Sequence, residues 1–264
     1  MGRIEDKFES LRAKNEKALI VYLTAGDPSL EATKKIILGL EEAGVDILEI
    51  GVPFSDPTAD GPVIQAASQR ALKTGTTLGG VLSLVADVRR ISQVPIVLFG
   101  YFNPIFAYGV EKFALAAQKA GVDGVLVVDL PQEEAQELRI YTDAAGIDFI
   151  SLVAPTTGKK RLRNIVRTAT GFLYYISITG VTGTAAPKIE DIQREVGKIR
   201  RITDMPIAVG FGISNAVQAS QIAAIADGVV IGSALVKLID ENRNNDDLMK
   251  IVTAYAAGIK EGLR

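Results

Sequence analysis

Short apolar runs alternate with longer amphipathic segments along almost the whole chain. The runs are rich in β-branched residues, as buried strands are, and the segments between them repeat apolar positions at helical spacing. The predicted strands are residues 18–23, 47–51, 95–99, 124–128, 149–153, 172–176, 207–209 and 228–231. Strands this apolar, alternating with helices, predict an α/β fold in which crossover helices cover a parallel sheet.

The segments predicted as helices complete this pattern, which has a period of about 25 to 30 residues. They are residues 30–43, 62–73, 78–91, 110–120, 131–145, 159–168, 189–202 and 215–226, and further helices follow Ser233 and Asp246. Eight such units close into a (β/α)8 TIM barrel of about 250 residues, so one TIM-barrel domain is expected over 1–264, with extra helices after strands 2 and 8. An open doubly wound sheet is the alternative, but it rarely carries eight even units, and the first strand is not followed by a GxGxxG turn.

One more amphipathic helix is predicted ahead of the first strand, over residues 4–14. Ile4, Phe8 and Leu11 recur there at helical spacing, with charged residues between them. A helix with a single apolar stripe at this position is expected to cap one end of the barrel as a plug.

The charge balance and the apolar runs narrow the possible partners. The net charge is −2, from 29 basic and 31 acidic residues, and the basic residues form almost no clusters, so nucleic acid is not expected as a partner. No apolar run approaches the roughly 20 residues of a membrane span, and the N-terminal segment has acidic residues where a signal peptide does not. The chain is therefore expected to be cytoplasmic, without a membrane partner.

The absence of histidine and cysteine restricts the chemistry further. It excludes thiol nucleophiles, disulfides, Ser-His-Asp triads and the common zinc sites, so no metal is expected. A Schiff-base aldolase would need a lysine inside a strand, and none of the predicted strands has one. Acid and base catalysis by carboxylates on a phosphorylated substrate, such as a carbon–carbon cleavage, remains.

Two carboxylates in the stretch 46–62 fit that chemistry. Glu49 lies within the apolar strand 47–51, where burial of a charge is costly unless the charge is paired or used. Asp60 ends the Pro-, Ser- and Gly-containing loop that follows and can fold back over the strand end. A strand-end group facing a loop group is how barrel enzymes assemble acid and base.

Each carboxylate also has a structural interpretation. Glu49 can belong to a buried ion pair, although the predicted strand ends supply almost no lysine or arginine. Asp60 can serve as a turn residue or a helix cap ahead of Pro62, which is a common role for aspartate.

Glycines follow the last three predicted strands and suit an anion site. In barrels, phosphate binds at the loops after strands seven and eight and at a helix N-terminus, where free N–H groups point at the anion. The candidate positions are Gly180, Gly183, Gly210, Gly212, Gly232 and Ser233. Any single glycine can instead simply mark a turn.

Aromatic residues gather at the same strand ends, in a chain with no tryptophan. They are Tyr22, Phe99, Tyr101, Tyr174 and Phe211. Each alone is typical of a core, but together they can wall a flat apolar pocket for an aromatic substrate that carries a phosphate.

Five motifs in this order and spacing resemble one enzyme family. They are Glu49 in its strand, PFSDPTADGP at 53–62, GVTG at 180–183, GFGIS at 210–214 and GSALVK at 232–237. From about Ala18 to the C-terminus, the chain resembles the α subunit of tryptophan synthase. The resemblance implies a lyase that cleaves indole-3-glycerol phosphate to indole and glyceraldehyde 3-phosphate. It also implies an αββα heterotetramer for tryptophan biosynthesis, in which the β subunit holds pyridoxal phosphate and this chain holds no cofactor.

The resemblance implies roles for individual residues as well. Glu49 and Asp60 become the catalytic pair, and Thr182 matches the residue that holds Asp60 when the site closes. Phosphate contacts fall on Gly183, Gly212, Gly232 and Ser233, and Tyr174 matches a tyrosine beside the substrate. Because Glu49 must exchange a proton while Asp60 stays charged, Glu49 in its drier position is expected to have the higher pKa.

Two positions depart from the family pattern. Thr58 stands where an apolar residue is common, and Ile178 stands where some members carry arginine. Both lie in loops, so they concern loop closure and signalling to the partner rather than the chemistry. Two alternatives remain at this point: a stand-alone indole-releasing lyase without a β subunit, and a barrel kept only as an activating or binding subunit.

Overall fold

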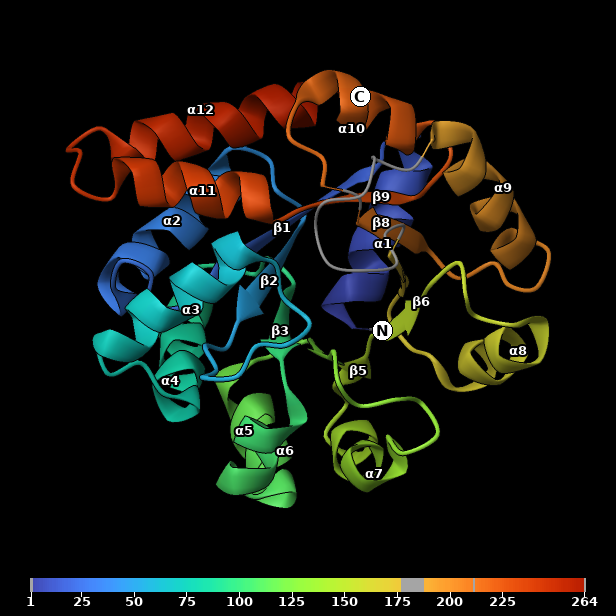
Figure 1. Cartoon of the computed structure of the whole chain (residues 1–264), viewed down its shortest axis with the longest axis horizontal. Helices are drawn as coiled ribbons and strands as arrows, with labels where there is room; N and C mark the ends of the chain where they lie inside the picture. The colour runs from blue at the N-terminus through green and yellow to red at the C-terminus, as the bar shows by residue number, and fades with distance from the viewer. Residues whose placement is uncertain (1, 177–187, 211, 264) are drawn as a thin grey trace.

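A computed structural model of the chain describes residues 2–176, 188–210 and 212–263, and shows a parallel sheet curved into a barrel inside a ring of helices (Figure 1). The strands are β1 Ala18–Thr24, β2 Ile47–Gly51, β3 Ile96–Gly100, β4 Gly124–Val127, β5 Asp148–Phe149, β6 Ser151–Val153, β7 Leu173–Ile176, β8 Ile207–Gly210 and β9 Gly228–Ile231. Their order in the sheet is β5-β4-β3-β2-β1-β9-β8-β7-β6. The expected TIM-barrel fold is confirmed, and the open doubly wound alternative is not.

The prediction of one continuous fifth strand over residues 149–153 is wrong at its centre. It is divided into β5, which pairs with β4, and β6, which pairs with β7. At the break, the Ile150 N–H still donates to Val125 O at 2.9 Å, on the β4 side. The nine labelled strands therefore represent the eight predicted ones, and the barrel closes where the chain changes from one neighbouring strand to the other.

The helices follow the predicted pattern, with two corrections. They are α1 Arg3–Ala13, α2 Leu30–Glu42, α3 Pro62–Lys73, α4 Leu78–Arg89, α5 Phe102–Tyr108, α6 Val110–Ala120, α7 Gln136–Ala144, α8 Lys159–Thr168, α9 Ile189–Arg200, α10 Ala216–Ala223, α11 Ser233–Asn242 and α12 Leu248–Glu261. Helix α5 was not predicted, although its Pro104 lies in the first turn, where no N–H is needed. Helix α7 begins at Gln136 rather than at residue 131. Across the described ranges, no helix is both long and apolar enough to span a membrane.

The core has two layers, one between the sheet and the helices and one inside the barrel. Ile4, Phe8 and Leu11 of α1 belong to the inner layer, together with strand residues such as Ile47 and Phe172. The Phe8 and Phe172 rings lie 5.7 Å apart. Helix α1 is therefore the predicted plug, and it closes the amino-terminal end of the barrel.

A repeated arrangement of aspartates joins the strands at this closed end. Three aspartates each precede a strand and accept a hydrogen bond from a backbone N–H of the neighbouring strand. They are Asp46, Asp123 and Asp227. The donors are Leu19, Ile96 and Ile207, each at 2.8 Å. Each aspartate also pairs with a cation, namely Lys260, Arg89 and Arg200 respectively. These contacts tie the outer helices to the strand starts, so this end of the barrel serves stability.

We expect the variant Lys260→Met to lose about 3 kcal/mol of unfolding free energy, because removing one partner of a buried ion pair leaves the other charge uncompensated. Lys260 Nζ lies 2.6 Å from Asp46 Oδ2, and both residues are buried. The Leu19 N–H and the more distant Lys7 still compensate part of the Asp46 charge in the variant. The expected loss of unfolding free energy is therefore at the low end of the usual range. Urea unfolding measures the effect.

The matched control is Lys237→Met, which removes an exposed lysine paired with Glu241 on α11. This variant should stay within about 0.5 kcal/mol of the unmodified chain, as exposed pairs do. If both variants lost the same unfolding free energy, the buried ion pair would contribute no more to stability than the exposed one.

Candidate active site

Glu49 lies in the interior of the barrel. It is the third residue of β2, where its Cα pairs with Tyr22 on β1 and with Val97 on β3. Side chains at paired positions of neighbouring parallel strands share a face, and Val97 and Ile47 both belong to the inner core. The predicted alternation along β2 therefore places the Glu49 carboxyl group inside the barrel, with an exposed fraction of 0%.

The Glu49 carboxyl group has no partner within the described residues. Among residues 2–176, 188–210 and 212–263, no group forms a hydrogen bond with either carboxylate oxygen of Glu49. Burial without compensation raises its pKa to about 8. The buried ion pair considered from the sequence is therefore absent from the described part of the chain, and Glu49 holds its proton at neutral pH.

Asp60 is held at the mouth of the barrel by Tyr101. The Tyr101 hydroxyl, just beyond the end of β3, donates to Asp60 Oδ2 at 3.0 Å and accepts the Ala59 N–H at 3.0 Å. Gly61 is the N-cap of α3, so Asp60 does not cap that helix as the alternative supposed. Burial raises the pKa of Asp60 to about 6, although the Tyr101 hydrogen bond opposes the shift. The two pKa values follow the order expected from the sequence.

Tyr22 and Tyr174 bring the two carboxylates into one site. Burial, and then the charges of Asp60 and Glu49, raise the pKa of the Tyr22 hydroxyl, so both carboxylates lie near this single group. Burial and then the Glu49 charge raise the pKa of Tyr174. Gly51 and Gly210 leave room for these rings, because a Cβ at either position would collide with the neighbouring tyrosine.

The predicted anion site lies at the same end of the barrel. Gly212 follows β8 and adopts a left-handed conformation with φ +61°, which glycine favours. Gly232 and Ser233 follow β9 and open α11, whose first helical bond runs from Val236 N to Gly232 O. The N–H groups ahead of Val236 have no intrahelical partner, and no described side chain caps them, so they can hold an anion.

Some predicted positions lie outside the described residues. They are Ile178, Gly180, Thr182, Gly183 and Phe211. Thr58 is described, and its side chain is exposed at the surface of the loop between β2 and α3.

Three residues of the site were missed by the sequence reasoning. Gln65 on α3 donates from Nε2 to Asp60 O at 2.9 Å, Phe54 packs its ring 5.2 Å from that of Tyr101, and Thr24 lies in hydrogen-bond contact with Tyr22. No local pattern marks these residues. Their role depends on the fold of the loop before α3 and on the ends of β1 and β3.

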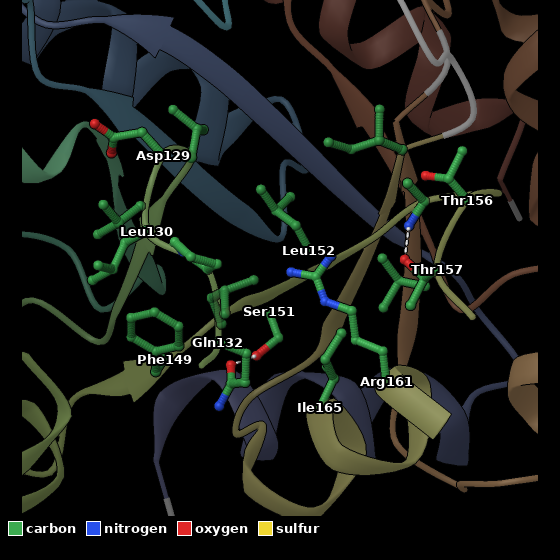
Figure 2. Close-up of a pocket in the computed structure, with 17 residues that line it drawn as sticks. Asp129, Leu130, Gln132, Phe149, Ser151, Leu152, Thr156, Thr157, Arg161 and Ile165 are labelled. Carbon is green, nitrogen blue, oxygen red and sulfur yellow. Dashed lines mark hydrogen bonds between the residues drawn. The ribbon is translucent and has the colours of Figure 1, made fainter. Parts of the chain in front are cut away.

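A cavity of about 400 Å³ lies where the chain passes from β5 to β6. Figure 2 shows Phe149, Leu152 and Ile165 around it, with the Arg161 side chain reaching over it from α8. Leu152 also packs against the inner core, so the cavity adjoins the barrel interior. Glu49 and Asp60 are not among its lining residues.

No three Asp or Glu side chains in the described ranges gather closely enough to hold a metal ion. The arrangement supports acid and base chemistry: a neutral carboxylic acid inside the barrel, an anchored carboxylate at its mouth, and backbone N–H groups for an anion.

Comparison with known sequences places the chain beside one family over its whole length. Residues 8–263 match the family model described as "Tryptophan synthase alpha chain". The tryptophan synthase alpha chain of Geotalea uraniireducens is 50% identical over 264 residues, which cover 100% of this chain and 98% of that protein.

Solved structures show the same relationship. The tryptophan synthase subunit alpha of Legionella pneumophila superimposes with a TM-score of 0.94 at 37% identity, covering 100% of this chain and 98% of that one. A chain of the aminoacrylate-bound tryptophan synthase of M. tuberculosis gives a TM-score of 0.90 at 35% identity, covering 100% of both chains.

Proposed function

This chain belongs to the tryptophan synthase alpha chain family, and from that premise we propose that Glu49 and Asp60 are the two side chains that carry out its reaction. The chain is a lyase that cleaves indole-3-glycerol phosphate to indole and glyceraldehyde 3-phosphate. The observation that supports the assignment is the pair of buried carboxyl groups near one tyrosine, with Glu49 unpartnered and Asp60 anchored.

Glu49 is the proton donor and acceptor in this proposal. With a pKa of about 8 it is protonated at neutral pH and can protonate C3 of the indole ring. Its carboxylate then takes the proton of the glycerol hydroxyl, whose oxygen forms the aldehyde carbonyl as the carbon–carbon bond breaks. The bond pair returns to the indole ring, and Glu49 regains its starting proton.

Asp60 stabilises the intermediate in which C3 is protonated. That indoleninium carries its positive charge at the ring nitrogen, where an ionised carboxylate accepts the N–H in a charge-assisted hydrogen bond. A pKa of about 6 keeps Asp60 ionised at neutral pH, and the Tyr101 hydroxyl holds it in position. Because this charge is in position before the reaction, it stabilises the positively charged intermediate more than it stabilises the bound neutral substrate, and this difference accelerates the reaction.

The remaining predicted residues bind the two ends of the substrate. Gly212, Gly232 and Ser233 hold the phosphate with their backbone N–H groups, together with Gly183 from outside the described residues. The indole lies among a set of aromatic and polar residues. They are Tyr22, Tyr101, Tyr174, Thr182 and Phe211.

The assembly is also a proposal. A tryptophan synthase β subunit is the expected partner of an alpha chain, in a cytoplasmic αββα heterotetramer that makes tryptophan. Pyridoxal phosphate belongs to that subunit, and this chain uses neither a cofactor nor a metal of its own. The lack of histidine and cysteine in the chain is consistent with carboxylate chemistry.

The test is indole release from indole-3-glycerol phosphate by the purified chain, alone and with a β subunit. We expect slow release by the chain alone and a rise of about tenfold or more in the complex, because coupling between sites typically changes activity on this scale. Equal rates would favour the stand-alone lyase, which none of the observations above supports. No release in either case would contradict the proposed function.

We expect Tyr101→Phe to lower kcat about tenfold, because the loss of one hydrogen bond to a charged group costs about 1.5 kcal/mol or more. That bond lowers the pKa of Asp60, so its removal should move the acidic limb of the pH–rate profile above its starting value of about 6. The control is Tyr108→Phe on α5, whose ring lies 4.7 Å from Lys112 Nζ and is not among the groups that shift the pKa of Glu49 or Asp60. An unchanged acidic limb in Tyr101→Phe would contradict the positioning role.

A further inference from the structure

A second cavity lies outside the barrel, between α8 and α9, with a volume of about 550 Å³. Figure 1 shows α8 and α9 on the outer side of β6, and Tyr175 of β7 also lines the cavity. The volume is in the range of small-molecule sites.

The floor of this cavity is apolar and faces away from the catalytic residues. Val153 and Tyr175 line it from β6 and β7, with Leu162 and Ile199 from the helices. Along each strand the adjacent residue, Leu152 or Tyr174, points into the barrel instead. A ligand on this floor would therefore occupy a site separated from the active site by one layer of the sheet.

The rim carries excess positive charge. Lys159 and Arg163 come from α8, and Lys198 and Arg201 come from α9. Only Lys198 is paired, with Glu195 at 2.7 Å, and in the described ranges the other three cations have no carboxylate partner. In a chain with net charge −2, this local excess is not a general property of the surface.

Two features of α8 make this charge unfavourable without an anion. Its first turn contains three cations, of which Arg161 is paired with Glu133, and it has no acidic residue, although the helix dipole favours negative charge there; Gly158 provides no side-chain cap. Lys159 and Arg163 are also a like-charge pair at i and i+4. An anion bound at this N-terminus would satisfy the free N–H groups and separate the like charges.

Tyr175 presents a polar group to the cavity. The residue has an exposed fraction of 2% and lines the cavity, and its hydroxyl forms no hydrogen bond within the described residues. The hydroxyl oxygen is not among the fully buried polar atoms, so it is accessible from the cavity. A ligand acceptor atom in the cavity would supply a hydrogen-bond partner.

We propose that the α8–α9 cavity binds a small organic anion with an apolar body, in the class of aromatic carboxylates. The rings lie on the Val153 and Leu162 floor, and the carboxylate lies at the N-terminus of α8 between Arg163 and Arg201, within reach of the Tyr175 hydroxyl. The site is distinct from the active site and does not depend on the reaction assigned to Glu49 and Asp60.

The test uses 2-naphthoate as the probe and amide NMR of the ¹⁵N-labelled chain as the readout. We expect saturable shifts confined to residues around the cavity, 153–163 and 195–202, with a Kd below about 1 mM. The uncharged 2-naphthylmethanol should bind at least about tenfold more weakly, because it lacks the charge-assisted contacts. Shifts confined to the barrel mouth, or no saturation, would overturn the proposal.

The variant Arg163→Gln/Arg201→Gln removes two rim cations from exposed positions and should weaken 2-naphthoate about tenfold or more. The matched control is Arg167→Gln, which removes a cation from the last turn of the same helix, outside the cavity lining, and should leave the Kd within about twofold. The spectrum of each variant away from the cavity reports on its folding. Undiminished binding by the folded double variant would exclude the proposed anion site.

Discussion

Replacing Glu49 with glutamine is expected to lower the rate of indole release by about a thousandfold, since positioned acid–base groups typically contribute 10²- to 10⁴-fold. Glutamine retains the shape of the side chain but neither delivers the C3 proton nor takes the hydroxyl proton. Steady-state indole release measures the effect, and kcat should fall more than KM rises. Asp87 on α4, a half-buried residue paired with Arg90, is replaced by asparagine as the control and should retain full activity.

The same variant should be more stable than the unmodified chain at alkaline pH. The Glu49 pKa is about 8 in the folded state against an ordinary value of 4.5, so between these pH values the folded state holds a proton that the unfolded state has released. Stability therefore falls as pH rises through this window, by about 3 kcal/mol in order of magnitude. Glu49→Gln lacks this titration, and its unfolding free energy should not show that loss between pH 5 and pH 8.

Urea unfolding at pH 5 and pH 8 separates the two consequences. Activity lost together with stability would indicate that Glu49 supports the fold. Activity lost while stability is gained at pH 8 is the combination expected of a functional group held in an unfavourable environment.

Replacing Asp60 with asparagine is expected to lower kcat by about a hundredfold to a thousandfold, the range measured when one preorganised electrostatic group is removed. The amide keeps the size of the side chain and its contact with Tyr101 but has no charge to stabilise the indoleninium. Binding of the neutral substrate should change little, so KM should remain within a few fold of its starting value, and steady-state kinetics tests both quantities.

The pH–rate profile provides a second check on Asp60. In the unmodified chain, kcat/KM should fall below about pH 6, as Asp60 becomes protonated, and above about pH 8, as Glu49 loses its proton. Asp60→Asn should lose the acidic limb and keep the alkaline one. Unchanged indole release by Asp60→Asn would contradict the role proposed for this residue.

The sequence by itself determined the barrel, the plug helix and the two carboxylates. Periodicity is a local property, so apolar runs of five residues and helices of about twelve could be located without knowing their neighbours. Glu49 was recognisable because a carboxylate inside an apolar strand is costly at any place in a fold. Asp60 was recognisable from the composition of its loop and from its distance to Glu49 along the chain.

Only the tertiary structure decided which residues meet. Tyr101 holds Asp60 across 41 positions of sequence, the fifth strand divides at Ile150 to close the barrel, and Tyr175 lines a cavity between α8 and α9. These contacts depend on strand register and on how helices pack around the barrel, which are set by residues distant in the chain. Local patterns specify the elements, whereas the pKa values, the anchoring of Asp60 and the second cavity arise from burial, which exists only once the elements are assembled.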